Sequence, residues 1–430
     1  MNHPGSSAGR SATRAGKQRL ASGVAATLRT HTAPTIAIIG AFWVWCALLS
    51  FPMIELNPDF ADAPTTFALG GTVLVGQITG IALFIATVSL MHASRALASL
   101  GRLSLAQMAI IAIIYLSATL QLHDDEAATF IGVFYTFLLM LTAVMLSVVW
   151  TLPSGGIETS MNGASVIFCL FGISAMAILG LPDGRNVGGI QPNLFAAPLL
   201  AGFILSQFHA GKIGIVIRIM CFAMAAMVSS RYAMIGCITA LVVHDLTFNG
   251  LRPWKVAAAI VGVLSCIFLW PQITIMLALD DPSRDLSSGF TGRDEYWSAA
   301  MATITDHPFG IGFKRATAFE SGHNGYLKTL VEFGIVGGGL IIFFVGCVVS
   351  VAGIEAVRST GLDRQQRRFA CARLGGLIAL AFGAFFQPQL FSLGDAFGVT
   401  LLLLLFKPGT RPVAGRAARR TNAPRATIAT

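Results

Sequence analysis

The amino-acid sequence predicts an all-α, polytopic membrane protein with about twelve transmembrane helices. Hydrophobic residues make up 55% of the 430-residue chain, charged residues make up only 11%, and the mean hydropathy is +0.73. A soluble globular protein carries about twice that share of charge. Apolar runs of about 17 to 25 residues, long enough to cross a bilayer as a helix, recur along the sequence.

The apolar runs are assigned to spans in chain order. The spans cover residues 34–54, 67–91, 106–120, 128–150, 161–181, 194–208, 213–229, 232–248, 256–275, 327–351, 374–388 and 393–406. The run from Ile213 to Leu246 is too long for one crossing, since its 34 residues at 1.5 Å each would reach about 51 Å. The polar sequence Ser229-Ser230-Arg231 is therefore expected to form a turn between two spans.

Lysine and arginine are distributed unevenly between the two sides of the predicted bundle. Twenty-two of the 29 fall on the side that holds both termini. Four acidic residues share that side: Glu158, Asp245, Glu355 and Asp363. Because the cytoplasmic side of membrane proteins is enriched in Lys and Arg, both termini are expected to be cytoplasmic.

The two ends of the chain are predicted to be disordered basic tails, residues 1–33 and 407–430, around a single transmembrane domain, residues 34–406. Their basic side chains would lie next to an anionic membrane leaflet. The net charge of +9 therefore does not require nucleic acid as a partner.

The seven cysteines all fall in or beside apolar spans, and they form neither a CxxC pair nor a metal-like cluster. They are expected to be packing residues. The sequence predicts no metal site and no cofactor.

The longest connection, residues 272–326, is placed on the side opposite the termini and is rich in polar and ionisable residues. Connections of this length usually carry function. Thr291 and Asp294 have the spacing of a helix-capping pair, and the helical pattern then continues to Asp306, shortly before Pro308. We therefore expect this loop to contain short helices and to hold the catalytic groups.

Arg293 would lie in the first turn of that helix and would share one face with Trp297, Ala300 and Ile304. This face is expected to rest at the membrane surface, with Trp297 beside the substrate. A guanidinium group near a helix N-terminus suits a phosphate group. The alternative is a surface arginine that pairs with a neighbouring carboxylate.

The sequence Pro308 to Phe313 contains two glycines and leads to Lys314 and Arg315. Its backbone N–H groups could bind an anion, with both basic side chains contacting the substrate. A plain turn is the preferred interpretation, because a lone GxG sequence is a weak signal.

His323 and Asn324 open the tenth span, and His323 is predicted to share a helix face with Tyr326, Leu327 and Leu330. An imidazole with a reference pKa near 6.5 can accept a proton from a sugar hydroxyl at neutral pH. Asn324 is predicted to contact the substrate beside it. The alternative is a helix-capping or interfacial histidine.

Three more ionisable residues are candidate substrate-binding groups. Glu332 lies nearly two turns deeper and needs a partner, for which Arg231 and Arg293 are the candidates. Arg231 is kept at membrane depth in the predicted turn, although it could instead extend to the outer headgroups. Arg185, in another outer loop, is a further candidate.

Four sequence fragments resemble a known family. GRDEYW at 292–297, DHPFGIGF at 306–313 and HNGYLKTLVEFGIVG at 323–337 resemble the signature outer-loop region of the O-antigen ligase and polysaccharide polymerase superfamily. SSR at 229–231 resembles the Ser-Arg turn of that family, and the order and spacing of the fragments also match.

The resemblance implies a metal-independent, inverting glycosyltransferase of the bacterial inner membrane. Its donor would be a glycan carried on undecaprenyl diphosphate, and its site would face the periplasm among membrane lipids. By position, His323 matches the general base for the acceptor hydroxyl, and Arg231 and Arg293 match arginines that hold the diphosphate.

The acceptor would be either the lipid A core or another lipid-linked glycan, so O-antigen ligase and polysaccharide polymerase both stay open. Two alternatives of other classes remain. One is a twelve-span secondary transporter, and the other is a non-catalytic scaffold of envelope polysaccharide assembly.

Overall fold

The computed structural model describes residues 101, 103–119, 126–182, 186–188, 192–276, 293–313, 315–316, 320, 322–388, 390 and 396–409. These residues form helices, turns and loops, with no β-strand among them beyond the bridge residues Asn186 and Val187. The predicted all-α fold class is therefore confirmed. The predicted spans at 34–54 and 67–91, the N-terminal tail and nearly all of the C-terminal tail lie outside the described residues.

The helices are, in chain order, α4 (Leu105–Thr119), α5 (Glu126–Ser147), α6 (Ser154–Leu179), α7 (Pro192–Ser206), α8 (Lys212–Met227), α9 (Arg231–Asn249), α10 (Pro253–Phe268), α11 (Trp270–Met276), α12 (Arg293–Asp306), α13 (Gly325–Arg358), α14 (Arg364–Gly383) and α15 (Ala396–Leu405). Short 3₁₀ turns follow α5 and α13. Each predicted span from residue 106 onward coincides with a helix, and α12 ends at Asp306 as predicted and begins two residues after the predicted N-cap Thr291.

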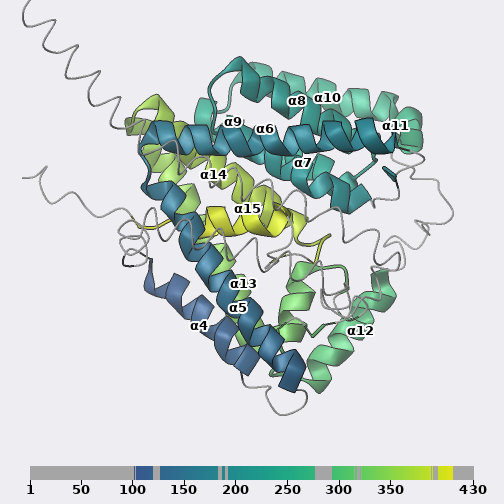
Figure 1. Ribbon diagram of the computed structural model, residues 1–430. Helices are drawn as coiled ribbons and strands as arrows, with labels where there is room; N and C mark the ends of the chain where they lie inside the picture. The colour runs from purple at the N-terminus through teal and green to yellow at the C-terminus, as the bar shows by residue number, and fades with distance from the viewer. Residues whose placement is uncertain are drawn as a thin grey trace, which may run out of the picture.

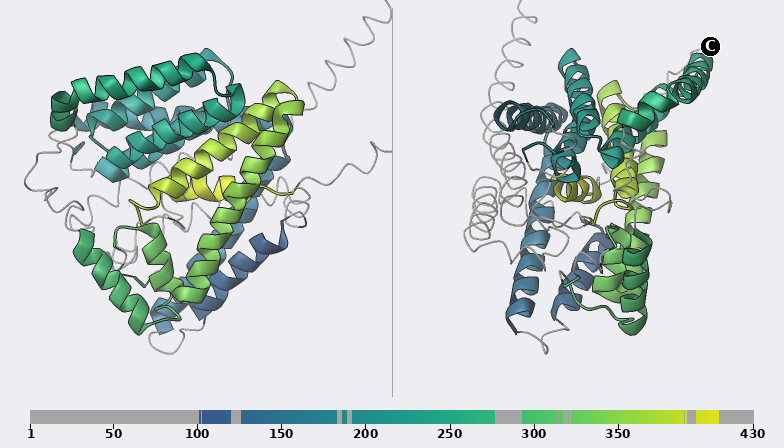
Figure 2. Two further views of the ribbon diagram at one scale, coloured as in Figure 1. Left: turned by 180° about the vertical axis from the view of Figure 1, so that it is seen from behind. Right: turned by 90° about the vertical axis from the view of Figure 1, so that its right-hand side faces the viewer.

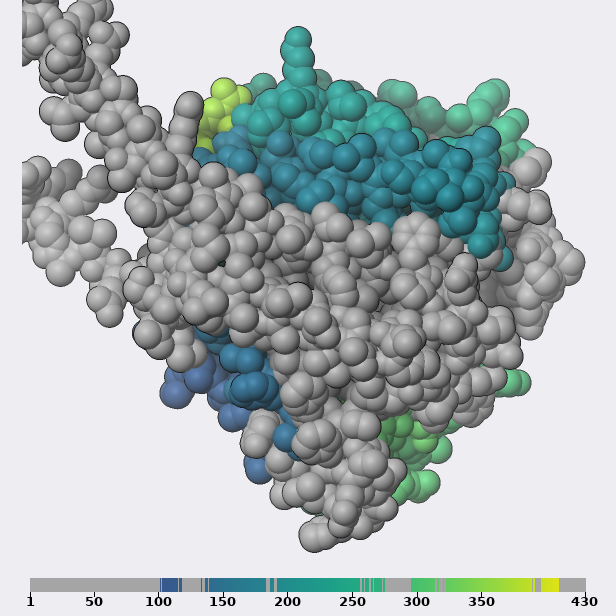
Figure 3. Space-filling model, in the orientation of Figure 1, coloured from purple at the N-terminus to yellow at the C-terminus, as the bar shows by residue number. Residues whose placement is uncertain are grey.

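Several described helices have the character of membrane spans. Three are long and apolar enough to cross a bilayer, namely α6, α9 and the segment Gly325–Gly361 that contains α13. Large apolar side chains face outward, including Ile219 (62% exposed) and Phe343 (70% exposed). Figure 3 shows α6 on the outside of the molecule, where its Ile178 is 80% exposed. Such apolar surface is suited to lipid, and the protein is a membrane protein.

Two helices begin earlier than hydropathy predicts. Helix α6 begins at Ser154 rather than 161, and α14 begins at Arg364 rather than 374. The additional turns are polar, so they do not register as a span, although their backbone hydrogen bonds are helical. The predicted span 256–275 is interrupted at Leu269, which separates α10 from α11.

The helices form two groups. Figure 1 shows α6 to α11 across the top of the view, whereas α4, α5 and the long part of α13 run alongside one another below, with α12 at the lower right. Helices α14 and α15 lie between the two groups, and the rear view in Figure 2 shows the same arrangement. This central position explains why the buried core is concentrated around α15.

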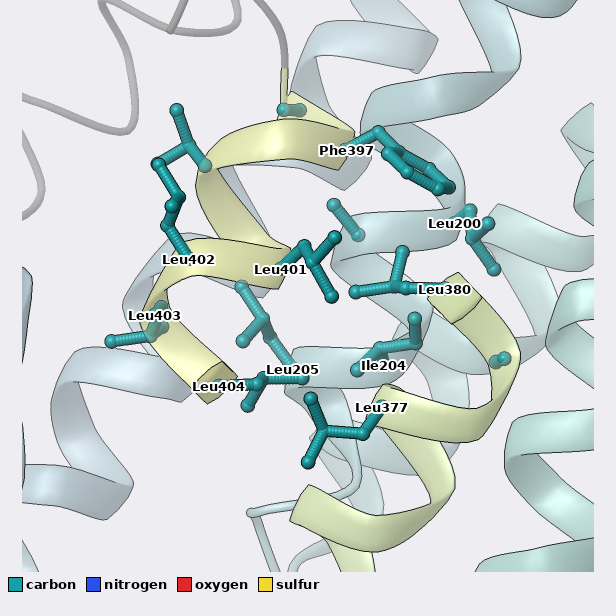
Figure 4. Packing of buried hydrophobic residues seen from close by; sticks show 14 of the residues in the cluster. Leu200, Ile204, Leu205, Leu377, Leu380, Phe397, Leu401, Leu402, Leu403 and Leu404 are labelled. Atoms are coloured by element: carbon teal, nitrogen blue, oxygen red, sulfur yellow. The ribbon is translucent and has the colours of Figure 1, made fainter. Parts of the chain in front are cut away.

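Every residue of α15 is buried. Figure 4 shows Leu401 to Leu404 of α15 packed against Leu200, Ile204 and Leu205 of α7 and against Leu377 and Leu380 of α14. Ten residues extend only about 15 Å, half of the hydrocarbon thickness of a bilayer. Helix α15 is therefore a core helix of the bundle and has no lipid-facing surface.

Three side chains from other elements satisfy the last backbone carbonyl groups of α15. Trp150 Nε1 donates to Leu403 O (2.8 Å), Arg373 Nε donates to Leu404 O (2.9 Å), and Gln107 Nε2 donates to Leu405 O (3.1 Å). A helix end buried in the protein needs such partners because water cannot reach it.

The polar groups around Glu158 gather the ends of three helices. The Glu158 carboxylate accepts from His209 Nδ1 (3.1 Å) and from Gln365 Nε2 (2.5 Å), and it lies 3.6 Å from Arg368 Nη1. Glu158 lies in the second turn of α6, His209 lies shortly after α7, and the other two residues lie in the first two turns of α14. These contacts place the three helix ends at the same end of the bundle.

Two of the other three acidic residues predicted on the terminal side lie in similar contacts, and the third, Asp363, is the N-cap of α14. Asp245 pairs with Lys255, and Glu355 pairs with both Arg373 Nη1 (2.9 Å) and Lys407 Nζ (2.8 Å). Burial lowers the pKa of Lys407, while the negative charge of Glu355 acts in the opposite direction. We call the part of the molecule formed by these residues and the Glu158 group the ion-paired end.

Candidate functional site

The C-terminal end of α14 organises the end of the bundle opposite the ion-paired end. Twenty helical residues separate the two ends along α14, a rise of about 30 Å, which matches the thickness of a bilayer. The backbone N–H of Gly325 donates to Ala384 O (2.7 Å), and the Tyr326 hydroxyl donates to Ala381 O (2.7 Å). Helix α13 therefore begins directly against the end of α14.

His323 lies just before α13 and not on it, which corrects the predicted helix face. Its φ of +48° is left-handed, and the helix begins only at Gly325. Asn324 is the N-cap, because its side chain accepts from the backbone N–H groups of Tyr326 (2.9 Å) and Leu327 (3.2 Å). The cap is thus Asn324, and the imidazole of His323 is half-buried in the turn before it.

Two neighbouring aromatic residues of α12 hold this turn. The Tyr296 ring meets the His323 imidazole edge to face, with centroids 5.3 Å apart and planes at 60°. Trp297 Nε1 donates to the carbonyl oxygen of Gly322 (2.9 Å). Gly322 has a φ of +58°, and a Cβ added there would lie 3.0 Å from Cδ1 of Trp297. The close approach favours glycine at this position.

These contacts fasten the first turn of α12 to the His323 turn. Arg293, the first residue of α12, precedes Tyr296 by three residues and Trp297 by four, so it belongs to the same side of the helix. Its backbone has the predicted position, and its side chain lies outside the described set. Arg293 and His323 are thereby brought to one region from positions 30 residues apart.

The apolar face of α12 does not rest at the membrane surface as predicted. Ala300 is fully buried and Ile304 is 5% exposed, and both pack with Val331 and Leu327 of α13. The hydrophobic effect is satisfied inside the protein here, because α13 offers a complementary apolar surface. Helix α12 is therefore anchored to α13 along its length.

The predicted turn Pro308 to Phe313 supplies hydrogen-bond partners to backbone groups at a break in α13. Helix α13 breaks at Gly334 (φ +72°), and this break leaves backbone groups without partners inside the helix. Three backbone hydrogen bonds supply these partners: Ile311 N donates to Val331 O (2.9 Å), Gly312 N donates to Glu332 O (2.9 Å), and Ile335 N donates to Pro308 O (2.9 Å). The N–H groups of Ile311 and Gly312 are therefore engaged by protein, and the interpretation as a structural turn holds.

Glu332 is 3% exposed, and the described partner of its carboxylate is Lys328 Nζ at 3.8 Å. This pair lies one turn apart on α13. Arg231 forms no ion pair with Glu332 among the described residues, and the expected pair with Arg293 stays a prediction, because the Arg293 side chain lies outside the described set. Of the two basic residues predicted after the turn, Arg315 is half-buried beside the α12–α13 contact, and Lys314 lies outside the described residues.

The turn before α9 carries Arg231 and is held to the start of α7. Ser230 Oγ donates to Asn193 Oδ1 (3.3 Å), and the Tyr232 hydroxyl donates to Asn193 O (2.8 Å). Tyr232 also packs beside the end of α14, since a Cβ added at Gly383 would lie 3.9 Å from Cδ2 of Tyr232. Gly383 directly precedes the residue that binds the start of α13, so the Arg231 and His323 turns meet at the same helix end.

Arg231 is half-buried and forms no ion pair with a carboxylate among the residues that the structure describes. A guanidinium group in that position can accept an anionic ligand without breaking an existing pair. Arg185, the other arginine predicted in an outer loop, lies outside the described residues.

Backbone strain is concentrated in these two turns. Ser229 (φ +50°) and His323 (φ +48°) are the non-glycine residues with positive φ in the described ranges of the chain. Left-handed backbone is uncommon for such residues and clusters at functional sites. The strain occurs in two of the four fragments that carried the family resemblance.

Sequence reasoning missed the residues that hold the site together. Three of the five tyrosines in the chain lie here: Tyr232, Tyr296 and Tyr326. Each is adjacent to, or within three residues of, a predicted catalytic residue, and this proximity was the available signal. The carbonyl groups at the end of α14 could not be identified from the sequence, because every residue has a backbone carbonyl group.

Comparison with known proteins places this region in a family. Residues 216–344 match the family model described as O-antigen ligase, and no curated protein matches the chain. The matched segment runs from α8 into α13 and includes Arg231, Arg293, His323 and Glu332. The resemblance seen in the four fragments is confirmed for this segment, which matches the O-antigen ligase domain of that superfamily.

Proposed function

We propose that the protein is a membrane glycosyltransferase of the O-antigen ligase or polymerase type, acting on a glycan linked to undecaprenyl diphosphate at the periplasmic face. The family match supports a ligase- or polymerase-type role in glycan transfer. The observation that carries the finer proposal is the meeting of the His323 and Arg231 turns at the end of α14, with the first turn of α12 fastened to His323.

His323 serves as the general base. It accepts the proton of the acceptor hydroxyl while the hydroxyl oxygen attacks the anomeric carbon of the donor. The bond between that carbon and the diphosphate oxygen breaks, and attack from the opposite face inverts the anomeric centre. His323 lies in a left-handed turn before α13, and its imidazole is half-buried beside Tyr296.

Arg231 and Arg293 bind the diphosphate. Negative charge grows on the leaving diphosphate as the glycosidic bond breaks, so guanidinium groups at that position stabilise the transition state more than the ground state. Arg231 has no carboxylate partner among the described residues, and Arg293 occupies the first turn of α12, where the helix dipole also favours an anion.

The remaining candidate residues have supporting roles. Trp297 positions the His323 turn through Gly322, and Asn324 fixes the start of α13, so the two act on the site through the backbone. Arg185, Lys314 and Arg315 are retained as candidate contacts for glycan or phosphate. Glu332 and Lys328 form a buried pair that stabilises the segment of α13 below the site.

The acceptor distinguishes two versions of the proposal. A lipid A core acceptor makes the protein an O-antigen ligase, and a second lipid-linked glycan makes it a polymerase. Both use the same base and the same diphosphate site, because the donor is common to both. A secondary transporter would instead hold its charged groups near mid-membrane.

The test is complementation of a deletion strain. His323→Ala, inserted at normal abundance, is expected to abolish formation of the surface glycan, because no other group replaces the base. His307→Ala is the matched control, since His307 is an exposed histidine directly after α12, and its hydrogen bonds to the described residues involve only its backbone. Full activity of His323→Ala would remove His323 from the mechanism and would favour a non-catalytic scaffold.

The glycan pattern of the deletion strain separates the two acceptors. Single repeat units on lipid A indicate a polymerase, whereas long chains that remain on the lipid carrier indicate a ligase.

A further inference from the structure

Three basic side chains at the ion-paired end are half-buried or buried and form no ion pair among the described residues. Arg218 on α8, His244 on α9 and Arg367 on α14 gather where α9 packs between α8 and α14. The helices are in close contact at this level, since a Cβ added at Gly375 of α14 would lie 2.7 Å from Ala240 O of α9. This is the opposite end of the bundle from His323, so the group is separate from the candidate glycan site.

His244 is buried without a polar partner on one side. Only 9% of the residue is exposed, its ring stacks on Phe248 with centroids 5.6 Å apart and planes at 10°, and its buried Nε2 has no hydrogen-bond partner. A buried ring nitrogen without a partner is unfavourable, because the loss of its hydrogen bonds to water is not compensated. Nε2 of His244 is therefore suited to a ligand that supplies a hydrogen-bond donor or acceptor.

Two arginines with unused donors lie in this region: Arg218 is near His244, and Arg367 lies beside Phe248, the ring on which His244 stacks. Arg218 lies within electrostatic range of His244, and its Nε donates to Gly214 O (3.1 Å). The Arg367 guanidinium lies 5.5 Å from the Phe248 ring and donates from Nη2 to Thr247 O at 3.4 Å, while its buried Nε has no partner.

Neither Arg218 nor Arg367 forms an ion pair with a carboxylate in the described part of the chain, although this end is rich in such pairs. The nearby carboxylates are already engaged, Asp245 by Lys255 and Glu158 by Arg368. The group therefore carries excess positive charge in a partly buried place, which is unfavourable without an anion. A phosphate group fits, because guanidinium donors match phosphate oxygens.

The surface beside the group is apolar. Ile215 and Ile219, on the arginine-bearing part of α8, are 49% and 62% exposed, and Leu241, one turn before His244 on α9, is 43% exposed. Acyl chains of a lipid would lie along these side chains while its headgroup reaches the arginines. Basic sites between transmembrane helices bind anionic headgroups in this manner.

We propose that Arg218, His244 and Arg367 form a binding site for the phosphate headgroup of an anionic glycerophospholipid. The site stabilises the packing of α8, α9 and α14. It does not depend on the proposed glycosyltransferase activity, because it lies at the other end of the bundle.

The test measures the thermal unfolding of the purified full chain in neutral detergent with added phosphatidylglycerol, phosphatidylcholine or inorganic phosphate. Phosphatidylglycerol is expected to raise the unfolding temperature, and the other two additions are not. Arg218→Gln and Arg367→Gln are each expected to weaken the apparent affinity for phosphatidylglycerol about tenfold, through loss of a charged donor. Arg358→Gln is the matched control, since Arg358 is an exposed arginine at the same end, and it should keep wild-type affinity.

An equal response to inorganic phosphate would mean that the lipid is not recognised, and it would overturn the proposal. So would equal weakening by Arg358→Gln, which would indicate general attraction to an anionic surface. If a glutamine variant does not insert, Arg218→Lys and Arg367→Lys carry the same test. They keep the charge but lose the planar donor pair, so a weakening of about threefold is expected, and wild-type affinity would contradict the proposal.

Discussion

The two ends of the helix bundle are held together in different ways. At the ion-paired end, side-chain ion pairs connect the helices: Glu158, Asp245 and Glu355 each bind basic residues from other elements. At the site end, hydrogen bonds to backbone groups connect the elements. The start of α13 binds carbonyl oxygens at the end of α14, and the segment 308–312 completes the break in α13.

The difference shows how a charged site can be kept available for a ligand. Where ion pairs fix the structure, the arginine and carboxylate side chains already bind one another and are not available to a ligand. Where the backbone fixes the structure, the side chains of Arg231 and His323 can serve the proposed chemistry, and their two turns contain the left-handed residues Ser229 and His323. Substitutions at the ion-paired end should therefore change stability, and substitutions of site side chains should change activity.

The largest expected effect comes from the backbone at the site end. Gly334→Ala would place a Cβ 2.4 Å from Pro308 O at a residue with φ +72°. Unfolding should become easier by more than about 3 kcal/mol, because the segment 308–312 can no longer reach α13. Abundance in membranes and thermal unfolding in detergent measure this loss.

Gly339→Ala is the matched control, since nothing lies within 4 Å of a Cβ added there in the same helix. It should be neutral or slightly stabilising. If Gly334→Ala were equally well tolerated, the backbone at this end would not be the element that holds it.

The next effect belongs to the ion-paired end. Arg373→Met removes a buried cation that binds both Glu355 and Leu404 O, while Lys407 still compensates Glu355. We expect a loss of about 2 kcal/mol in unfolding free energy, with the catalytic rate per folded molecule unchanged. Thermal unfolding combined with glycan transfer per inserted molecule separates the two quantities. A lower transfer rate with unchanged stability would contradict the expectation that substitutions at the ion-paired end change stability and not activity.

The arginine substitutions test the site side chains with charge preserved. Arg231→Lys and Arg293→Lys should each lower kcat/KM for the lipid-linked donor about tenfold, about 1.4 kcal/mol, because lysine cannot make bidentate contact with a phosphate. Thermal stability should stay near the wild-type value. Wild-type donor kinetics for both variants would show that neither arginine holds the diphosphate.

The smallest expected effect concerns the ring that contacts His323. Tyr296→Ala should lower glycan transfer about fivefold, since an edge-to-face aromatic contact is worth about 1 kcal/mol. Tyr296→Phe keeps the ring and should stay within about twofold of wild type. Equal losses in both variants would mean that the hydroxyl, and not the ring contact, positions the imidazole.

Hydropathy located the described apolar helices, although not all of their ends, and the distribution of Lys and Arg indicated the end at which ion pairs gather. The acidic residues predicted on the terminal side lie together with basic residues predicted there, as the Glu158 and Glu355 pairs show. The start of α14 was missed because its first turns are basic, and their burial depends on carboxylates from distant segments. The pair of Lys328 and Glu332 could have been predicted, since the two residues are four apart on a helix.

The conformation of the site could not be read from local sequence. His323 was expected on a helix face, yet its left-handed turn depends on Trp297, which is 26 residues earlier in the chain. The break at Gly334 likewise depends on hydrogen bonds from Pro308 to Gly312. Residue types and order identified the family, whereas contacts between distant segments decided the geometry.

The most direct test of the central claim, that the His323 turn and the ion-paired end face opposite sides of the membrane, is thiol labelling in cells with a permeabilised outer membrane. Single cysteines are introduced as His307→Cys near the site and Arg358→Cys at the other end, in a chain whose native cysteines are replaced. If the two ends face opposite sides, a membrane-impermeant maleimide labels the first variant and labels the second only after lysis. Labelling of the second variant alone in intact inner membranes would contradict it.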